Sequence, residues 1–229
     1  MKKYLFIFFI ANLFICSNVT AQHKGYKSAI GFTFSPDYAY RSLLSTDSAN
    51  KLFKEIQTTP QNAIMGFTSG LSYRFNLLGT IGIETGISYT RKGWSTDSVN
   101  SHSVIKNLFN YNYAVVPIKI RVNLPSGRRL FYINAGVIGG VLLDAAKTVS
   151  TAYFTGTLNS NQTTIEYKVS NEIYYSMVFG IGLDYRLISN LYFKIEPNFQ
   201  RTMSEYSKET VKAFLNSGGI NLGLLWGLK

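Results

Sequence analysis

The sequence predicts an all-β protein in which eight antiparallel strands close into an up-and-down transmembrane β-barrel. Three observations support this prediction. Apolar and polar side chains alternate over repeated segments, the connections alternate between short and long, and no long apolar run follows the N-terminal region. A transmembrane helix needs roughly 18 or more apolar residues. Alternating strands can cross lipid only as a closed barrel, because hydrocarbon offers backbone N–H and C=O groups no partner.

The composition is unusual for a water-soluble protein. Charged residues make up 15% of the chain, against about 25% in ordinary globular proteins. The chain also contains 16 Tyr, 16 Phe and 19 Gly. Aromatic residues are typical of the interfaces of a membrane barrel, and glycines on its inner face leave room for larger side chains in a narrow lumen.

The first 21 residues are a predicted secretory signal peptide. Two lysines precede an apolar core at residues 4–15, and Val19 and Ala21 occupy the small-residue positions before a cleavage site. The apolar core is shorter than the roughly 20 residues of a membrane-spanning helix. We therefore expect cleavage after Ala21, so that residues 22–229 form one outer-membrane barrel domain.

The cysteine content and the charge exclude several classes of site. Cys16 lies within the predicted signal peptide, so the mature chain has no cysteine for disulfides or Cys-ligated metals. Ile15 stands where lipoproteins carry a small residue, which argues against acylation of Cys16. Losing Lys2 and Lys3 lowers the formal charge from +11 to +9. The basic residues are dispersed, so we expect membrane lipid and lipopolysaccharide headgroups, not nucleic acid, as partners.

Period-two alternation divides the mature chain into eight segments. In LYFKIEPNFQ, one face carries Leu191, Phe193 and Ile195, while Lys194 and Glu196 lie on the other. A register slip of one residue would reverse the faces, so agreement along whole segments is informative. The predicted strands cover residues of about 25–36, 62–76, 79–92, 108–124, 129–143, 171–187, 190–203 and 213–228.

The connections between the predicted strands alternate in length. The sequences NLLG, PSGR and LISN have the chemistry of tight turns. The long connections are polar and cover residues of about 37–61, 93–107, 144–170 and 204–212. Short turns on one side and long loops on the other are typical of outer-membrane barrels, in which the turns face the periplasm. We expect both chain termini on the periplasmic side.

The polar faces of the predicted strands carry charges that would point into the lumen. They are Arg74, Glu84, Lys119, Arg121, Asp184, Arg186, Lys194 and Glu196. Charges at low dielectric must be paired, and eight strands leave little open bore. We therefore interpret this set as a structural network of ion pairs and hydrogen bonds. A conducting or substrate-binding lumen is the alternative.

Aromatic residues near the strand ends are candidates for the interfacial girdles. They are Tyr73, Tyr89, Trp94, Tyr111, Tyr185 and Trp226. One proline, Pro117, falls in the middle of the predicted strand YNYAVVPIKIRVNL. Proline has no N–H for the ladder, so we predict a bulge or a missing ladder bond there.

Candidate catalytic residues are few. The two histidines are His23, near the mature N-terminus, and His102, in a predicted loop, and neither has an evident Ser or carboxylate partner. No glycine-rich phosphate loop and no His/carboxylate cluster at metal spacing appears in the sequence. We expect no enzyme activity, no cofactor and no metal. A soluble lipocalin-like barrel and a lipid-modifying barrel enzyme are the alternatives.

Several motifs resemble the PorT-like outer-membrane β-barrel family of Bacteroidota. They are a leader ending in AQ, the segment IGFTFSPDY, the segment YAVVPIKIRVNL and the segment GIGLDYRL before a tight turn. The resemblance implies an outer-membrane barrel. It assigns no functional residues. The last predicted strand has an apolar outer stripe of Leu222, Leu224, Trp226 and Leu228, so we expect insertion by the barrel-assembly machinery. We expect a structural role, or binding of a protein or small ligand by the long extracellular loops.

Overall fold

The computed structural model describes residues 26–44, 61–77, 80–99, 103–126, 129–153, 160–166, 172–204 and 212–228. The predicted signal peptide with Cys16, and both histidines, lie outside these residues. The strands are β1 (Ser28–Leu44), β2 (Gln61–Asn76), β3 (Ile81–Val99), β4 (Ser103–Ser126), β5 (Arg129–Tyr153), β6 (Ser160–Glu166), β7 (Ile173–Arg186), β8 (Leu191–Thr202) and β9 (Lys212–Leu228). No helix among the described residues has the length and apolar character needed to cross a membrane.

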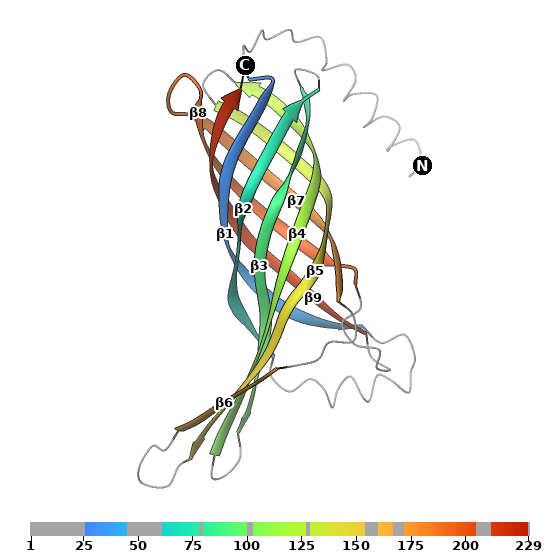
Figure 1. The fold of residues 1–229 in the computed structure, drawn as a ribbon, viewed down its shortest axis with the longest axis vertical. Helices are drawn as coiled ribbons and strands as arrows, with labels where there is room; N and C mark the ends of the chain where they lie inside the picture. Colours follow the sequence, from blue (N-terminus) through green and yellow to red (C-terminus); the bar gives the residue numbers. More distant parts are fainter. Residues whose placement is uncertain are drawn as a thin grey trace, which may run out of the picture.

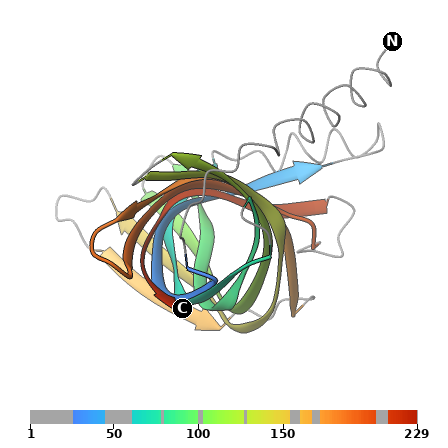
Figure 2. The same cartoon turned by 90° about the horizontal axis from the view of Figure 1, so that it is seen from above.

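Eight of these strands form a closed antiparallel ring, which confirms the predicted fold. The ring order is β1, β2, β3, β4, β5, β7, β8, β9, and β9 pairs with β1 again. Seen from above, the strands enclose a single narrow lumen (Figure 2). Short connections join β2 to β3, β4 to β5 and β7 to β8 at the same end as the pairing of Ser28 with Leu228. We call this the turn end, and the opposite end the loop end.

The strands run further at the loop end than the sequence predicts. β3 continues to Val99, β4 begins at Ser103 and β5 continues to Tyr153, so the predicted loops 93–107 and 144–170 are wrong over much of their length. β6 pairs with this part of β5, and together they form a four-stranded extension beyond the barrel, at the bottom of Figure 1. Apolar and polar residues alternate where the two faces of a strand meet different surroundings. A strand with water on both faces has no such requirement.

The two faces of the ring differ in chemistry as the alternation predicts. Outward side chains such as Met65 and Ile87 are 68% and 71% exposed, whereas inward Arg74 and Lys194 are 0% exposed. An apolar exterior around a charged interior suits a barrel in lipid. It is the opposite of the lipocalin-like alternative, which needs an apolar interior and a polar surface.

Two inward glycines leave space for bulky lumen side chains. A Cβ atom at Gly182 would lie 2.2 Å from Cζ of Tyr132, and one at Gly219 would lie 2.0 Å from Oδ1 of Asp37. Both distances are far below contact. Glycine at these positions therefore lets the Tyr132 ring and the Asp37 carboxylate cross the narrow lumen.

Pro117 interrupts one of the two ladders of β4. The β3–β4 bridges stop at Thr85 with Ile118 and resume at Ser88 with Val115, so the predicted missing ladder bond is confirmed. The β4–β5 ladder keeps its register at Pro117. A register shift occurs instead between Asn112 and Tyr113, nearer the loop end.

The predicted aromatic girdle is correct in part. Tyr73, Tyr89, Tyr185 and Trp226 are exposed on the outer surface of the barrel. Trp94 and Tyr111 are buried on the inner face, so their assignment to the girdle was wrong. They are buried because each continues the series of inward positions on its strand. Tyr111, for example, is two residues from inward Tyr113.

Candidate functional site: an ion-pair network across the lumen

Seven of the eight predicted lumen charges lie together inside the turn-end half of the barrel. The cations are Arg74, Lys119, Arg121 and Lys194, and the carboxylates are Glu84, Asp184 and Glu196. The strands that hold them are β2, β3, β4, β7 and β8. Each side chain points inward because it alternates with an apolar side chain that faces outward. We call these seven residues the lumen network.

Glu84 is the centre of the lumen network. Its Oε2 accepts from Nη2 of Arg74 at 2.8 Å. Its Oε1 lies 2.7 Å from Nζ of Lys194 and 3.2 Å from Nζ of Lys119. One carboxylate thus pairs with cations on three other strands. The pair with Lys194 joins β3 to β8, which are opposite each other in the ring.

The other two carboxylates extend the network to the remaining cations. Asp184 Oδ2 pairs with Nη1 of Arg74 at 2.6 Å and also accepts from Nη2 of Arg121. Glu196 pairs with Nζ of Lys119 at 3.1 Å and with Nζ of Lys194 at 2.8 Å. The network therefore braces the barrel across its lumen, in addition to the ladders around its wall.

Neutral groups complete the coordination of Glu196 and cover Arg121. Tyr132 Oη and Asn134 Nδ2 each donate to Glu196 Oε2 at 2.8 Å. The Arg121 guanidinium lies over the Tyr132 ring, 3.4 Å from its centroid. Tyr26, from the segment before β1, accepts from Nη1 of Arg74 at 2.7 Å. Hydrogen bonds of this kind are what buried ions need, because desolvation of an unpaired charge costs several kcal/mol.

Arg186 does not belong to the lumen network, although the alternation of β7 predicts it there. Its side chain is exposed, and its Nε donates to the carbonyl oxygen of Ser189 at 3.1 Å. Arg186 is the last residue of β7, where the lumen opens at the turn end. A long side chain at that position reaches the turn and water without the cost of desolvation.

Two buried charges in the lumen were not part of the predicted set. Lys92 on β3 is 0% exposed, and its Nζ donates to Tyr174 Oη at 2.9 Å and to Gln200 Oε1 at 2.5 Å. Asp37 on β1 is 1% exposed and accepts from the hydroxyls of Ser35 and Thr68. Continued alternation could have identified both residues. Lys92 lies at the end of a predicted strand, and Asp37 lies in the predicted loop 37–61, which is wrong for residues 37–44 because they continue β1.

Aromatic and aliphatic side chains fill the lumen towards the loop end. The buried cluster comprises Trp94, Tyr111, Tyr113, Val115, Ile138, Ala145, Tyr174, Val178 and Leu215. The rings of Trp94 and Phe109 stack with centroids 4.0 Å apart, and the Arg41 guanidinium lies 3.8 Å from the Trp94 centroid. The lumen thus has a charged half and an aromatic half.

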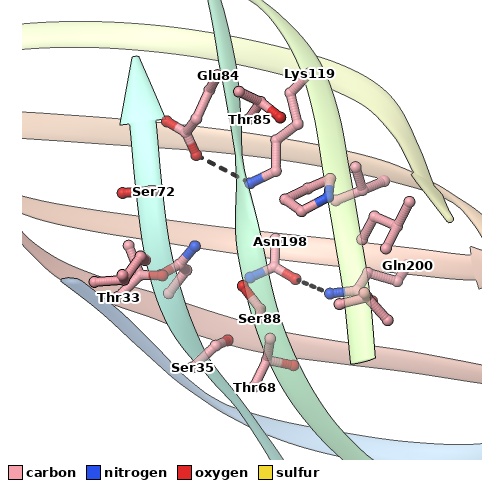
Figure 3. A pocket seen from close by; sticks show the side chains of 16 residues that line it. Thr33, Ser35, Thr68, Ser72, Glu84, Thr85, Ser88, Lys119, Asn198 and Gln200 are labelled. Atoms are coloured by element: carbon pink, nitrogen blue, oxygen red, sulfur yellow. Dashed lines mark hydrogen bonds and ion pairs between the residues drawn. The ribbon is translucent and has the colours of Figure 1, made fainter. Parts of the chain in front are cut away.

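A cavity of about 50 Å³ lies between these two halves. Glu84 and Lys119 border it on one side and Gln200 on the other, with Ser72, Ser88 and Asn198 along its wall (Figure 3). Small-molecule pockets are usually about 300–1,000 Å³, and a cavity of this size suits one or a few water molecules. The arrangement is therefore suited to bracing the barrel, not to holding an organic substrate.

Metal ligands do not gather in the part of the chain that the structure describes. No group of three His, Cys, Asp or Glu side chains lies close enough there to hold an ion. The three carboxylates of the lumen network are each paired with cations. Lysine and arginine occupy the positions around them that a metal would need.

Comparison with known proteins finds solved structures of low similarity and a matching family model. The structures of Ail from Yersinia pestis and of Neisserial surface protein A are similar to this chain at 14% and 11% identity. Each comparison covers 87% of this chain and 99% of the other, with TM-scores of 0.40 and 0.45. A search of curated proteins finds no match. A family model described as outer membrane protein beta-barrel domain matches residues 20–204. The chain therefore belongs to this family of outer-membrane β-barrel proteins.

Proposed function

We propose that this outer-membrane barrel has no enzymatic activity and acts as a structural or surface-binding element through its loop end. The observation that supports this function is the contrast between the two ends. Ion pairs and aromatic side chains occupy the lumen, while a four-stranded extension projects at the loop end. In the proposal, the loop end faces outward and the turn end faces the periplasm, as in other outer-membrane barrels.

The edge of the extension is the best candidate for the binding surface. Among the described strands, β6 pairs with β5 alone, and residues 161–165 are exposed. Natural edge strands are usually protected by Lys or Pro, and the β6 sequence SNQTTIE has neither. In the proposal, the outer edge of β6 pairs with an extended segment of a partner protein, as in β-strand addition.

The proposal also covers the export of the chain, its insertion, its lipid surroundings and its subfamily. The chain is exported by a signal peptide that is cleaved after Ala21, inserted by the barrel-assembly machinery and surrounded by membrane lipid and lipopolysaccharide. The motif around Pro117 supports membership of the PorT-like subfamily. A protein or a small ligand at the loop end is the remaining expected partner.

Single-cysteine labelling tests the proposed orientation, because the predicted mature chain lacks cysteine. Thr163→Cys in β6 should react with a membrane-impermeant maleimide in intact cells, since this residue is exposed at the loop end. Ser189→Cys, exposed at the turn end, is the matched control and should react only after the envelope is opened. The reverse pattern would show that the proposed orientation is wrong.

Ion conductance tests the proposal that the lumen is closed. Because buried side chains cross the lumen, the purified barrel in a planar bilayer should carry no steady current at 1 M KCl. At this high salt concentration, the current through even a narrow pore would be detectable. A stable open conductance that requires the folded, heat-modifiable barrel would instead favour the conducting lumen and contradict the structural role of the network.

A further inference from the structure

Two arginines stand on the lipid-facing surface of the barrel. Arg91 on β3 and Arg201 on β8 are both exposed. Neither guanidinium group makes an ion pair, hydrogen bond or ring contact with any residue in the described part of the chain. Unlike the seven residues of the lumen network, these two cations face outward and have no counter-charge among the residues that the structure describes.

Their heights on the barrel agree. Arg91 is ten residues beyond Ile81, and Arg201 is ten residues beyond Leu191, the first residues of β3 and β8 at the turn end. A strand of ten residues rises about 33 Å, which a tilt of about 40° reduces to roughly 25 Å across the membrane. That is the height of the apolar band of a membrane barrel. Both guanidinium groups therefore lie at its loop-end boundary, on opposite walls.

Apolar side chains lie directly below each arginine. On β3, the outward residues between Ile81 and Arg91 are Ile83, Thr85, Ile87 and Tyr89. The register partner of Arg91 on β2 is Phe67, whose ring lies 5.8 Å from that of Tyr89 and 6.2 Å from that of Phe34. These rings form a continuous apolar row beneath one guanidinium group.

The second arginine has a similar setting on the opposite wall. Arg201 pairs in register with Met177, and Phe199 pairs with Phe179 two residues nearer the turn end. All three of these apolar side chains are exposed on the outer face. The nearest outward carboxylate beside the first site, Asp144, is two strands from Arg91 and accepts a hydrogen bond from Asn112 at 3.2 Å. Among the described residues, no carboxylate pairs with either guanidinium group, and Asp97, six residues beyond Arg91 on β3, accepts from Asn62 instead.

We propose that Arg91 and Arg201 form two binding sites for the phosphate groups of a phosphorylated glycolipid in the outer leaflet. The guanidinium group can donate two hydrogen bonds to one phosphate, and the row below offers apolar surface to the acyl chains. The inference rests on the proposed orientation, in which the loop end faces outward. It goes further in naming the lipid chemistry, the residues and the number of sites.

Lipid binding to the purified mature barrel tests this proposal. The probes are diphosphorylated lipid A and the same lipid after dephosphorylation, and native mass spectrometry counts the bound copies. Arg91→Gln and Arg201→Gln should each weaken one of two sites at least about tenfold, because each removes the charged hydrogen-bond donor to one phosphate. The double variant should lose both sites for the phosphorylated lipid.

The control is Arg186→Gln, which removes an exposed arginine at the turn end and should leave lipid binding unchanged. Dephosphorylated lipid A should bind the wild type as weakly as it binds the double variant. The proposal is overturned if the double variant retains the phosphorylated lipid, if R186Q weakens binding equally, or if removing the phosphates has no effect. Heat-modifiable gel mobility verifies that each variant is folded. Binding in detergent does not depend on orientation, so the labelling experiment can fail independently.

Discussion

Replacing Glu84 with Gln should destabilise the barrel by about 3–5 kcal/mol, the cost typical of removing one partner from a buried ion-pair network. The substitution keeps the size of the side chain and removes one charge. The lumen network would then hold four cations and two carboxylates. Arg74, Lys119 and Lys194 would each lose an anionic partner while remaining buried in the lumen. Urea unfolding in phospholipid vesicles, followed by gel mobility of unheated samples, measures the effect.

A matched control and a second-site change test the electrostatic cause. Glu172→Gln makes the same chemical change at an exposed residue near the start of β7 and should shift stability by less than about 0.5 kcal/mol. Adding Lys194→Met to Glu84→Gln returns the network to one excess cation and should recover part of the loss. Equal midpoints for E84Q and E172Q would show that the network does not brace the barrel.

Replacing Val137 with Arg should cost about 2–4 kcal/mol when the barrel is folded in lipid, because a cation on the lipid face is most costly at the bilayer midplane. Val137 is 54% exposed and lies midway along the outward row of β5 that runs from Phe131 to Leu143. No lumen side chain changes, so the cost arises from the contact with hydrocarbon. Unfolding in vesicles and the yield of heat-modifiable barrel both report it.

Leu143→Arg is the matched control for this prediction. Leu143 is 58% exposed on the same strand but lies at the loop-end edge of the apolar row, beside exposed Asp144. The same substitution there should cost only about 0–1 kcal/mol. In a soluble barrel, both introduced arginines would be in water, and neither substitution would change the free energy of unfolding much. Equal, small effects at the two positions would therefore contradict the transmembrane fold.

The local pattern of the sequence predicted the eight strands of the ring because each strand separates lipid from lumen. That boundary imposes a period of two, as in β8, where Lys194 and Glu196 alternate with Ile195. The same pattern identified seven buried charges correctly. The same alternation also places Trp94 and Tyr111 at inward positions, where both are buried, although their position near the strand ends had suggested the girdle.

The sequence by itself thus determined the fold class, the strand faces and the set of charges available to the lumen. Only the tertiary structure decided which charges meet. Lys194 reaches Glu84 because β8 and β3 are opposite in the ring, and Arg74 reaches Asp184 in the same way. Such contacts depend on strand tilt and stagger, which no local period encodes. The loop-end extension with β6 could not be predicted from alternation either. A strand with water on both faces does not need to alternate apolar and polar side chains.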